Sequence, residues 1–369
     1  MTDWPVKTLG EVCDLIGGGT PSKDRPEFYG GEIPWATVRD LNVEVLRGTE
    51  HSITAEAVKS SSSNIIPSGS VVIATRVGLG KAVIVAQDTA INQDLRGLVV
   101  KKPKELMAEY LYWWYLSTVH LVVAAGTGAT VQGVKLPFVS GLAIPVPPLE
   151  EQKRIVELLD AATARVTELT ACYEQARTHA NNLFASALRA ALESKPDWPV
   201  KTLGEMLELS YGKPLDAKDR DDNSLIPVYG ANGVKAFSKK SLVAGPSIIV
   251  GRKGSAGELN FCEGPFWPLD VTYYVEHDAN ETDLSFLHYL LSLMDLPSLA
   301  KGVKPGINRN DVYALKSTVP PLEEQKRIVA RLELMRAKTS EMVAAYNAKL
   351  TAAKNLRQSI LEAAFAGDL

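Results

Sequence analysis

The stretch VPPLEEQKRIV decides the fold, because it occurs at Val146–Val156 and again at Val319–Val329. A second repeat, DWPVKTLGE, occupies Asp3–Glu11 and Asp197–Glu205. Repeats of this length cannot be chance, so the chain is an internal duplication. The offset between the copies falls from 194 residues at the first repeat to 173 at the second, so the second copy is 21 residues shorter.

The interiors of the two copies differ much more than their borders. A weaker match aligns SGSVVIATRVG (Ser68–Gly78) with AGPSIIVGRKG (Ala244–Gly254) at an offset of 176, which places Asp94 opposite Asp270. The remaining interior segments share little. Identical borders around divergent interiors indicate a common scaffold that carries two different tasks.

The sequence divides into four segments. Residues 1–148 and 196–320 are rich in Gly, Pro and short β-branched runs, which predicts short strands and turns with a helix near 108–123 and a counterpart near 284–294. Residues 149–195 and 321–369 have little Gly or Pro inside them. A Pro-Pro-Leu-Glu-Glu stretch, residues 147–151 and 320–324, stands at the start of each, which is typical of a helix start. We expect each to form one long helix.

Both long helices carry apolar residues at alternating steps of four and three, the pattern of a coiled coil. About 43 helical residues at about 1.5 Å each give a rod of roughly 65 Å. The rod could simply hold the protein together or set a distance between the globular domains, and we expect both. The predicted helix–helix seam comprises Ile155, Leu159, Val166, Leu169, Tyr173, Leu183, Ile328, Leu332, Met335, Met342, Tyr346, Leu356 and Ile360.

The composition is that of a globular protein: 46% of the 369 residues are hydrophobic, 22% are charged, and the formal net charge is −3. The longest apolar stretch, Leu111–Ala125, is too short to span a membrane. The start of the chain does not resemble a signal peptide, and three widely spaced cysteines suggest neither disulfides nor a zinc site. We therefore expect a reduced, cytoplasmic protein.

Catalytic motifs are missing from the sequence. It has no GxxxxGK[ST] phosphate loop, and VPPL at Val146–Leu149 lacks the polar and aromatic residues of an amino-methyltransferase motif. The five histidines are scattered and suggest no metal site, and no nucleophile–base pair stands out. We expect a non-catalytic chain with no metal and no cofactor of its own.

Basic residues cluster locally despite the negative total charge. Residues 59–104, 235–258 and 301–316 each carry an excess of Lys and Arg. Such clusters can neutralise phosphates, and arginine can read guanine edges in the major groove, although a solvated surface is the simpler interpretation of any single cluster. Corresponding clusters in both copies favour DNA.

The borders and interiors together resemble the specificity (S) subunits of type I restriction-modification systems. The residues that carry the resemblance are GGGTPSKDRPEFYGGEIPWATVRDL at Gly17–Leu41, YGKPLDAKDRDDNSLIPVYGANG at Tyr211–Gly233, and the duplicated PPLEEQKRI. The resemblance implies an α+β fold in which two mixed α/β target-recognition domains are joined by two long antiparallel coiled-coil helices and related by a pseudo-two-fold repeat. It also implies double-stranded DNA, two methyltransferase subunits that bind S-adenosylmethionine, and, through them, restriction subunits as partners.

Two other classes stay open at this point: an unusual catalytic methyltransferase, and a coiled-coil scaffold whose β domains bind carbohydrate or protein. If the chain reads DNA, Arg76 and Arg252 are equivalent base-reading candidates at the 176 offset, unless they form structural ion pairs with Asp94 and Asp270. The full set of candidate DNA-binding residues is Lys23, Arg25, Arg39, Arg76, Lys81, Lys135, Lys213, Lys235, Lys239, Lys240, Arg252, Lys253, Lys304 and Arg309.

Overall fold

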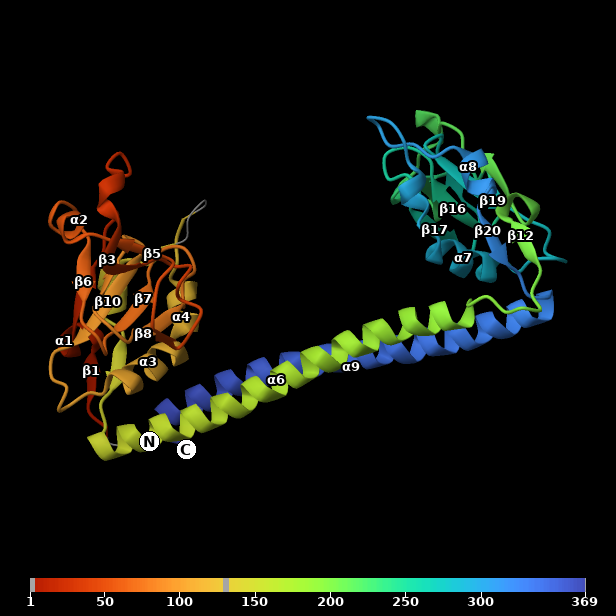
Figure 1. Cartoon of the computed structure of the whole chain (residues 1–369). Helices are drawn as coiled ribbons and strands as arrows, with labels where there is room; N and C mark the ends of the chain where they lie inside the picture. The colour runs from red at the N-terminus through yellow and green to blue at the C-terminus, as the bar shows by residue number, and fades with distance from the viewer. Residues whose placement is uncertain (1–3, 129–132, 369) are drawn as a thin grey trace. The chain divides into compact units, whose positions relative to one another are not determined.

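The structure, a computed structural model, describes residues 4–128 and 133–368 and divides into two compact units (Figure 1). Unit 1 comprises residues 1–174 and 348–369, and unit 2 comprises residues 175–347. The two long helices are α6 at Leu149–Ala191 and α9 at Leu322–Ala366. Each unit therefore contains one β-rich globular part and a segment of both helices.

Unit 1 contains a five-stranded sheet with the order β2-β10-β7-β8-β4, a four-stranded sheet with the order β5-β3-β9-β6, and the pair β1–β11. The bounds are β1 Val6–Thr8, α1 Leu9–Val12, β2 Cys13–Gly17, β3 Tyr29–Ala36, β4 Val45–Leu46, β5 His51–Ile53, α2 Ala55–Lys59, β6 Asn64–Ile66, β7 Val71–Ala74, β8 Ala82–Val85, β9 Thr89–Ile91, β10 Leu95–Val100, α3 Ala108–Ser117, α4 Val119–Ala124, α5 Leu136–Ser140 and β11 Ala143–Pro145.

The apolar run of β7 is explained by burial on both faces of its sheet. Val71 and Ile73 pack toward α3, whose aromatic side chains are buried on all sides, and α3 in turn packs on α6 and α9. Val72 and Ala74 point the other way, into a cluster shared with the four-stranded sheet. The sequence predicts one helix over 108–123, and the structure has two, α3 and α4, with a break at Thr118.

Unit 2 repeats this topology in shorter form. Its sheets have the orders β13-β19-β16-β17 and β15-β14-β18, with the pair β12–β20. The bounds are β12 Val200–Thr202, β13 Glu208–Tyr211, β14 Ile226–Gly230, β15 Gly233–Ser238, β16 Ser247–Gly251, β17 Leu259–Cys262, β18 Trp267–Pro268, β19 Thr272–Glu276, α7 Leu284–Leu293, α8 Arg309–Tyr313 and β20 Lys316–Thr318.

The duplicated borders attach each globular part to its long helix. The glutamine of PPLEEQKRI, Gln152 or Gln325, is fully buried. The Gln152 amide donates to the carbonyls of Glu105 and Pro147 and accepts from the Met107 amide, and Gln325 makes the same three bonds at the equivalent positions. The KTLGE border forms a capping box in both copies. The borders are identical because they make identical junctions.

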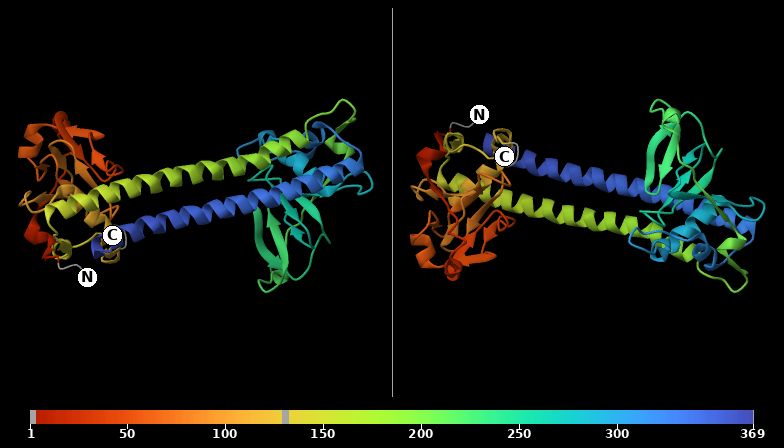
Figure 2. Two further views of the ribbon diagram at one scale, coloured as in Figure 1. Left: turned by 90° about the horizontal axis from the view of Figure 1, so that it is seen from below. Right: turned by 90° about the horizontal axis from the view of Figure 1, so that it is seen from above.

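Figure 2 shows α6 and α9 running side by side. In unit 1, Ile155 and Leu159 of α6 belong to one apolar cluster with Leu361 of α9. In unit 2, Leu188 near the end of α6 clusters with Ile328 near the start of α9. The pairing is therefore antiparallel, as the family resemblance implies.

The seam residues do not all face the partner helix. Ile155, Leu159, Val166, Ile328 and Leu332 are buried, and Tyr173, Met335, Tyr346 and Ile360 are half-buried. The prediction is wrong at Leu169, Leu183, Met342 and Leu356, which are 40% to 49% exposed.

The physical reason is the helix period. Among the buried and half-buried positions of α6 is a series that comprises Ile155, Leu159, Val166, Thr170, Tyr173, Ala180, Phe184, Leu188 and Ala191. This spacing follows the 3.6-residue period of a straight helix, from which a strict seven-residue repeat drifts by about 20° per heptad. Thr170 and Phe184 consequently occupy the contact face in place of Leu169 and Leu183, and Val343 of α9 replaces Met342.

Candidate nucleic-acid interface

Strand pairing fixes which residues of the two units are equivalent. Ala74 pairs with Leu95 where β7 meets β10, and Gly251 pairs with Thr272 where β16 meets β19. The offset between these positions is 177 residues rather than 176. Arg76 therefore corresponds to Lys253, and Thr75 corresponds to Arg252.

The prediction that Arg76 and Arg252 are equivalent is therefore wrong by one residue. The backbone agrees with the new register, since Val77 has φ +46° and its counterpart Gly254 has φ +80°. The sequence comparison matched Gly78 to Gly254 because both are glycines. In the structure it is a valine, the only non-glycine at positive φ among the described residues, that takes the place of Gly254.

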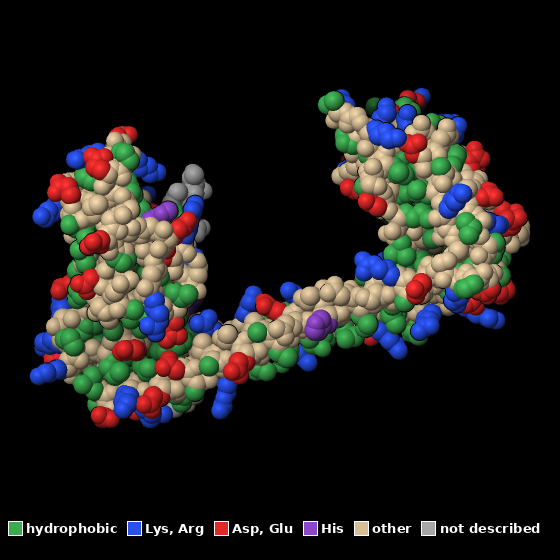
Figure 3. Space-filling model, in the orientation of Figure 1, with side chains coloured by type: hydrophobic (Ala, Val, Ile, Leu, Met, Phe, Trp, Pro, Cys, Tyr) green, Lys and Arg blue, Asp and Glu red, His purple; other side chains and the backbone are tan. Residues whose placement is uncertain are grey.

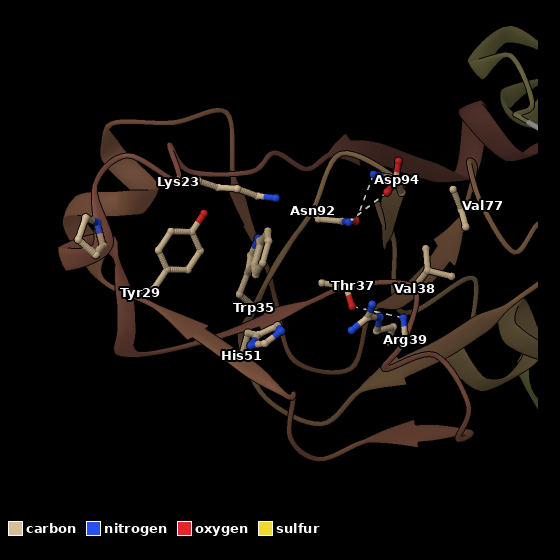
Figure 4. A pocket seen from close by; sticks show the side chains of 11 residues that line it. Lys23, Tyr29, Trp35, Thr37, Val38, Arg39, His51, Val77, Asn92 and Asp94 are labelled. Carbon is tan, nitrogen blue, oxygen red and sulfur yellow. Dashed lines mark hydrogen bonds between the residues drawn. The ribbon is translucent and has the colours of Figure 1, made fainter. Parts of the chain in front are cut away.

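A cavity of about 610 Å³ opens beside this turn in unit 1 (Figure 4). Tyr29, Trp35 and His51 supply aromatic walls, with the rings of Tyr29 and His51 6.1 and 6.4 Å from that of Trp35. The opposite side carries Asn92 and Asp94, whose side chains are hydrogen-bonded at 3.3 Å. The cavity therefore presents aromatic faces and polar side chains to one space.

Four of the predicted DNA-binding residues gather around this cavity. Lys23 and Arg39 line it. Arg76 lies with its Nε 3.9 Å from Oδ1 of Asp94, a loose ion pair in which the arginine side chain stays 55% exposed. Lys81 donates to the Asn42 side chain at 2.7 Å and to the carbonyl of Val38, which is also part of the lining. For Arg76, the ion-pair alternative thus has geometric support.

Unit 2 has a different arrangement at the same place on the scaffold. The guanidinium carbons of Arg252 and Arg309 lie 4.9 and 5.4 Å from the ring centre of Tyr211, and Tyr211 contacts Tyr273 edge to face at 5.1 Å. Arg252 donates to the backbone carbonyl of Asp270 at 3.0 Å and makes no ion pair with the Asp270 carboxylate. Each Tyr211–arginine contact is a cation–π interaction.

This cluster holds two like charges together without an acidic partner. Within the described residues, neither Arg252 nor Arg309 forms an ion pair with a carboxylate. Burial raises the pKa of Tyr273, so its hydroxyl stays protonated and donates to the carbonyl of Ile307 at 3.1 Å. The arrangement suits a ligand that is anionic or rich in hydrogen-bond acceptors.

The other predicted DNA-binding residues lie apart from these two groups. Arg25 pairs with Glu27 at 2.8 Å and covers the Phe28 ring. Lys240 lies 2.7 Å from the Asp219 carboxylate. The remaining ones are exposed, in loops, on a strand or at the start of α5: Lys135, Lys213, Lys235, Lys239, Lys253 and Lys304. Figure 3 shows Lys and Arg side chains (blue) interspersed with acidic ones over the surface of both units.

Two tryptophans occupy corresponding places without being equivalent in sequence. Trp35 of β3 pairs with Ala90 of β9, whereas Trp267 of β18 pairs with Val228 of β14, so the indole comes from opposite strands of the same parallel pair. Each indole donates to the backbone carbonyl at or just after a close-packed glycine: Gly19 for Trp35 at 3.2 Å, and Lys213 for Trp267 at 2.8 Å.

Sequence reasoning missed the aromatic residues of both sites. Trp35 and Tyr211 lie in the stretches that carry the family resemblance, but nothing in the sequence singles them out, and Tyr273 and His51 lie in no motif. Only the fold brings these residues to the arginines or to the cavity. Residues 4–128 and 133–368 contain no cluster of three His, Cys, Asp or Glu side chains that could hold a metal ion. In the same residues, no helix combines the length and the hydrophobicity that a membrane span requires.

Comparison with known proteins agrees with this picture. The family described as type I restriction modification DNA specificity domain matches residues 1–176 and 195–352. The chain is 25% identical over 368 residues to the EcoprrI specificity subunit of Escherichia coli, covering 94% of this chain and 91% of that protein. It is 34% identical over 165 residues to the MjaIX specificity subunit of Methanocaldococcus jannaschii, covering 42% and 37%.

Two solved structures share the fold. A chain from a study of complex assembly and conformational transition of the type I R-M system superposes with a TM-score of 0.82 at 22% identity, covering 99% of this chain and 98% of that one. The HsdS subunit from Thermoanaerobacter tengcongensis superposes with a TM-score of 0.64 at 21% identity, covering 100% and 98%.

Proposed function

Because the chain belongs to the type I restriction-modification DNA specificity family, we propose that it is the subunit that reads double-stranded DNA for such a complex. The observation that carries the proposal is the cluster of Arg252 and Arg309 around Tyr211, which holds two cations without an acidic partner among the described residues. Phosphates and guanine edges both satisfy such a cluster.

Each unit reads one half of a bipartite site, and the halves differ. The same scaffold carries Arg252 and Arg309 in unit 2 but a cavity flanked by Arg39 and Arg76 in unit 1. Different side chains at equivalent positions require different base sequences. Sequencing the methylated positions in a strain that carries this chain and its partners tests the proposal, and a continuous or palindromic methylated motif would contradict it.

The long helices set the spacing of the half-sites and dock the catalytic partners. The four seam positions left exposed form two equivalent pairs at the repeat offset of 173: Leu169 with Met342, and Leu183 with Leu356. Two equivalent apolar positions per repeat suit two methyltransferase subunits bound in equivalent ways. Those subunits bring S-adenosylmethionine and, through them, the restriction subunits join, so the chain itself acts in the cytoplasm without catalysing a reaction.

The docking proposal is tested by charge. Replacing Leu183 and Leu356 with Glu places carboxylates where apolar contacts with the partner are expected, so co-purification of the methyltransferase subunit should fall sharply. The matched control, Leu183→Ala with Leu356→Ala, keeps these positions uncharged and should retain more partner. Equal co-purification of the wild-type and Glu variants would place the docking surface elsewhere.

The spacing proposal is tested by length. A heptad inserted near Ala176 and a second near Lys349, where the Tyr173 ring meets the Lys349 ammonium at 5.3 Å, lengthens both helices by about 10 Å, roughly three base pairs. Seven residues fall about 20° short of two full turns, so the contact faces stay nearly aligned. The unspecified spacer of the methylated motif should grow while both half-sites stay the same. An unchanged spacer in a folded, active variant would refute the proposal that the helices set the spacing.

A further inference from the structure

The cavity of unit 1 is lined by aromatic, polar and cationic side chains. Figure 4 shows Tyr29, Trp35 and His51 along one side and Asn92 with Asp94 along the other. Lys23 and Arg39 add two cations to the lining, and within the described residues neither forms an ion pair. Its volume of about 610 Å³ lies in the range of small-molecule sites.

The cavity is not a requirement of the scaffold. Strand pairing makes Val228 the counterpart of Trp35, and the 177 offset makes Leu269 and Val271 the counterparts of Asn92 and Asp94. Unit 2 therefore builds the same strands with aliphatic residues at these places. Both units keep an indole in this strand pair, so Trp35 also serves the scaffold, but the polar Asn92 and Asp94 of unit 1 need a reason other than folding.

A strained residue stands at the edge of this cavity. Val77 lines it, is 49% exposed and has φ +46°, a conformation that a β-branched side chain adopts only at a cost. Unit 2 has Gly254 at the equivalent position, where the same turn is free of strain. Backbone strain of this kind clusters at ligand-binding and other functional sites. An isopropyl group at the cavity edge suits contact with a ligand.

We propose that this cavity holds one nucleobase, an assignment that rests on the proposed DNA-reading function. The ring stacks among Tyr29, Trp35 and His51, and its hydrogen-bonding edge meets Asn92, Asp94 and Thr37. The attached phosphate lies toward Lys23 and Arg39. A flat heterocycle with donors and acceptors on its edge and an anion on its sugar matches all three parts of the lining.

The base comes from the target duplex, extruded from its stack within the unit 1 half-site. Extrusion requires unstacking and unpairing, which the aromatic contacts offset. A free nucleotide offers the same chemistry to the cavity. The two sources differ in what they require: an extruded base needs the cognate duplex, whereas a free nucleotide binds without DNA.

The test uses the full chain assembled with its methyltransferase subunits, without S-adenosylmethionine. 2-Aminopurine is placed at each position of the cognate duplex in turn, and its fluorescence rises where the base leaves the stack. At one position of the unit 1 half-site the rise should disappear in the His51→Ala and Tyr29→Ala variants. Binding of the cognate duplex should weaken about 5- to 150-fold in these variants.

Two controls separate this signal from others. A base extruded by the methyltransferase subunit should keep its fluorescence rise in both variants. His120→Ala, which removes an exposed histidine of α4 in the same unit, should leave every position unchanged. An abasic site opposite the responding position should tighten binding, because the base is then already unpaired.

Each outcome decides the proposal. Fluorescence that is the same in wild type and in the His51→Ala and Tyr29→Ala variants at every position, with no binding of AMP, CMP, GMP or dTMP, overturns it. Binding of one of these nucleotides that needs His51, with no extruded base, supports a nucleobase site and assigns it to a free nucleotide. If the complex shows no salt-dependent binding to any duplex, the proposed function fails, while the nucleotide titration still tests the cavity.

Discussion

Replacing Arg252 with Ala separates base reading from phosphate binding in unit 2. One N–H of Arg252 donates to the Asp270 carbonyl. The guanidinium carbon lies 4.9 Å from the ring centre of Tyr211 and 5.8 Å from that of Tyr273. These contacts fix the plane of the guanidinium and leave its other donors able to face a ligand. A bidentate contact between arginine and guanine contributes about 1–3 kcal/mol, which corresponds to a loss of about 5- to 150-fold in affinity. The loss should be confined to duplexes with the cognate base at one position.

The cost of Arg252→Ala to folding is smaller and can be measured separately. The substitution removes cation–π contacts worth about 0.5–1 kcal/mol at an exposed site and one hydrogen bond worth about 1 kcal/mol. Against a typical domain stability of about 5–15 kcal/mol, unit 2 should stay folded. Thermal unfolding of the variant checks this expectation.

The assay is equilibrium binding of the assembled complex to a library with a randomised unit 2 half-site, at several salt concentrations. Arg252→Lys keeps the charge but loses the planar fork, so it should relax the same position as Arg252→Ala. The neighbouring Lys253 is exposed, and Lys253→Ala should weaken all sequences alike and reduce the salt slope by about one unit. A uniform loss of affinity for all sequences in Arg252→Ala would refute the base-reading role.

Three further expectations follow from the packing and the backbone. Val77→Gly should raise the free energy of unfolding by about 1 kcal/mol, and Gly254→Val should lower it by about 1–2 kcal/mol. A Cβ added at Gly254 would meet no atom within 4 Å, so only the positive φ opposes the side chain there. Denaturant titrations measure both changes, and packing alone would not predict their opposite signs. Phe184→Ala should lower the free energy of unfolding by about 1–3 kcal/mol because its ring packs in the core of unit 2, whereas Leu183→Ala should change it by less than about 0.5 kcal/mol. Equal losses of stability in the two variants would support the heptad seam instead. Burial lowers the pKa of His288, with a contribution from a nearby arginine, so the folded state favours the neutral ring. Unit 2 should therefore lose stability as the pH falls below about 6.5. In unfolding curves measured between pH 7 and 5, His288→Gln should make the free energy of unfolding less dependent on pH.

The parts of the fold that the sequence predicts are those specified by local signals. Pro-Pro followed by Glu-Glu marks the start of both long helices, and the structure begins α6 at Leu149 and α9 at Leu322. In the first turns, salt bridges join residues three positions apart, Arg154 with Glu151 and Lys326 with Glu323. These features depend on residues a few positions apart, so the sequence displays them directly.

The parts that the sequence mispredicts depend on three-dimensional geometry, namely the helix period, the backbone dihedral angles and the pairing of distant strands. A four-and-three pattern selected Leu183, whereas the true helical period turns Phe184 toward the core of unit 2, where its ring lies 6.0 Å from that of Tyr289. A match of glycine with glycine selected the 176 offset, whereas the backbone places Val77 where the other copy has Gly254. The cavity was invisible for a further reason: Tyr29, His51 and Asn92 are brought together only by the pairing of strands distant in sequence.

The crossed placement of the two tryptophans limits how the units can be recombined. Trp35 lies on β3 and Trp267 on β18. A chimaera that inherits β14 from unit 2 but β9 from unit 1 therefore has no indole in this strand pair, and the backbone carbonyl that accepts the indole hydrogen bond loses its donor. The reciprocal graft brings two indoles into a space shaped for one. Paired strands must therefore be inherited together. We therefore expect a chimaera joined at the duplicated borders, where the junctions are the same, to keep this packing, and one joined between β3 and β9 to lose it.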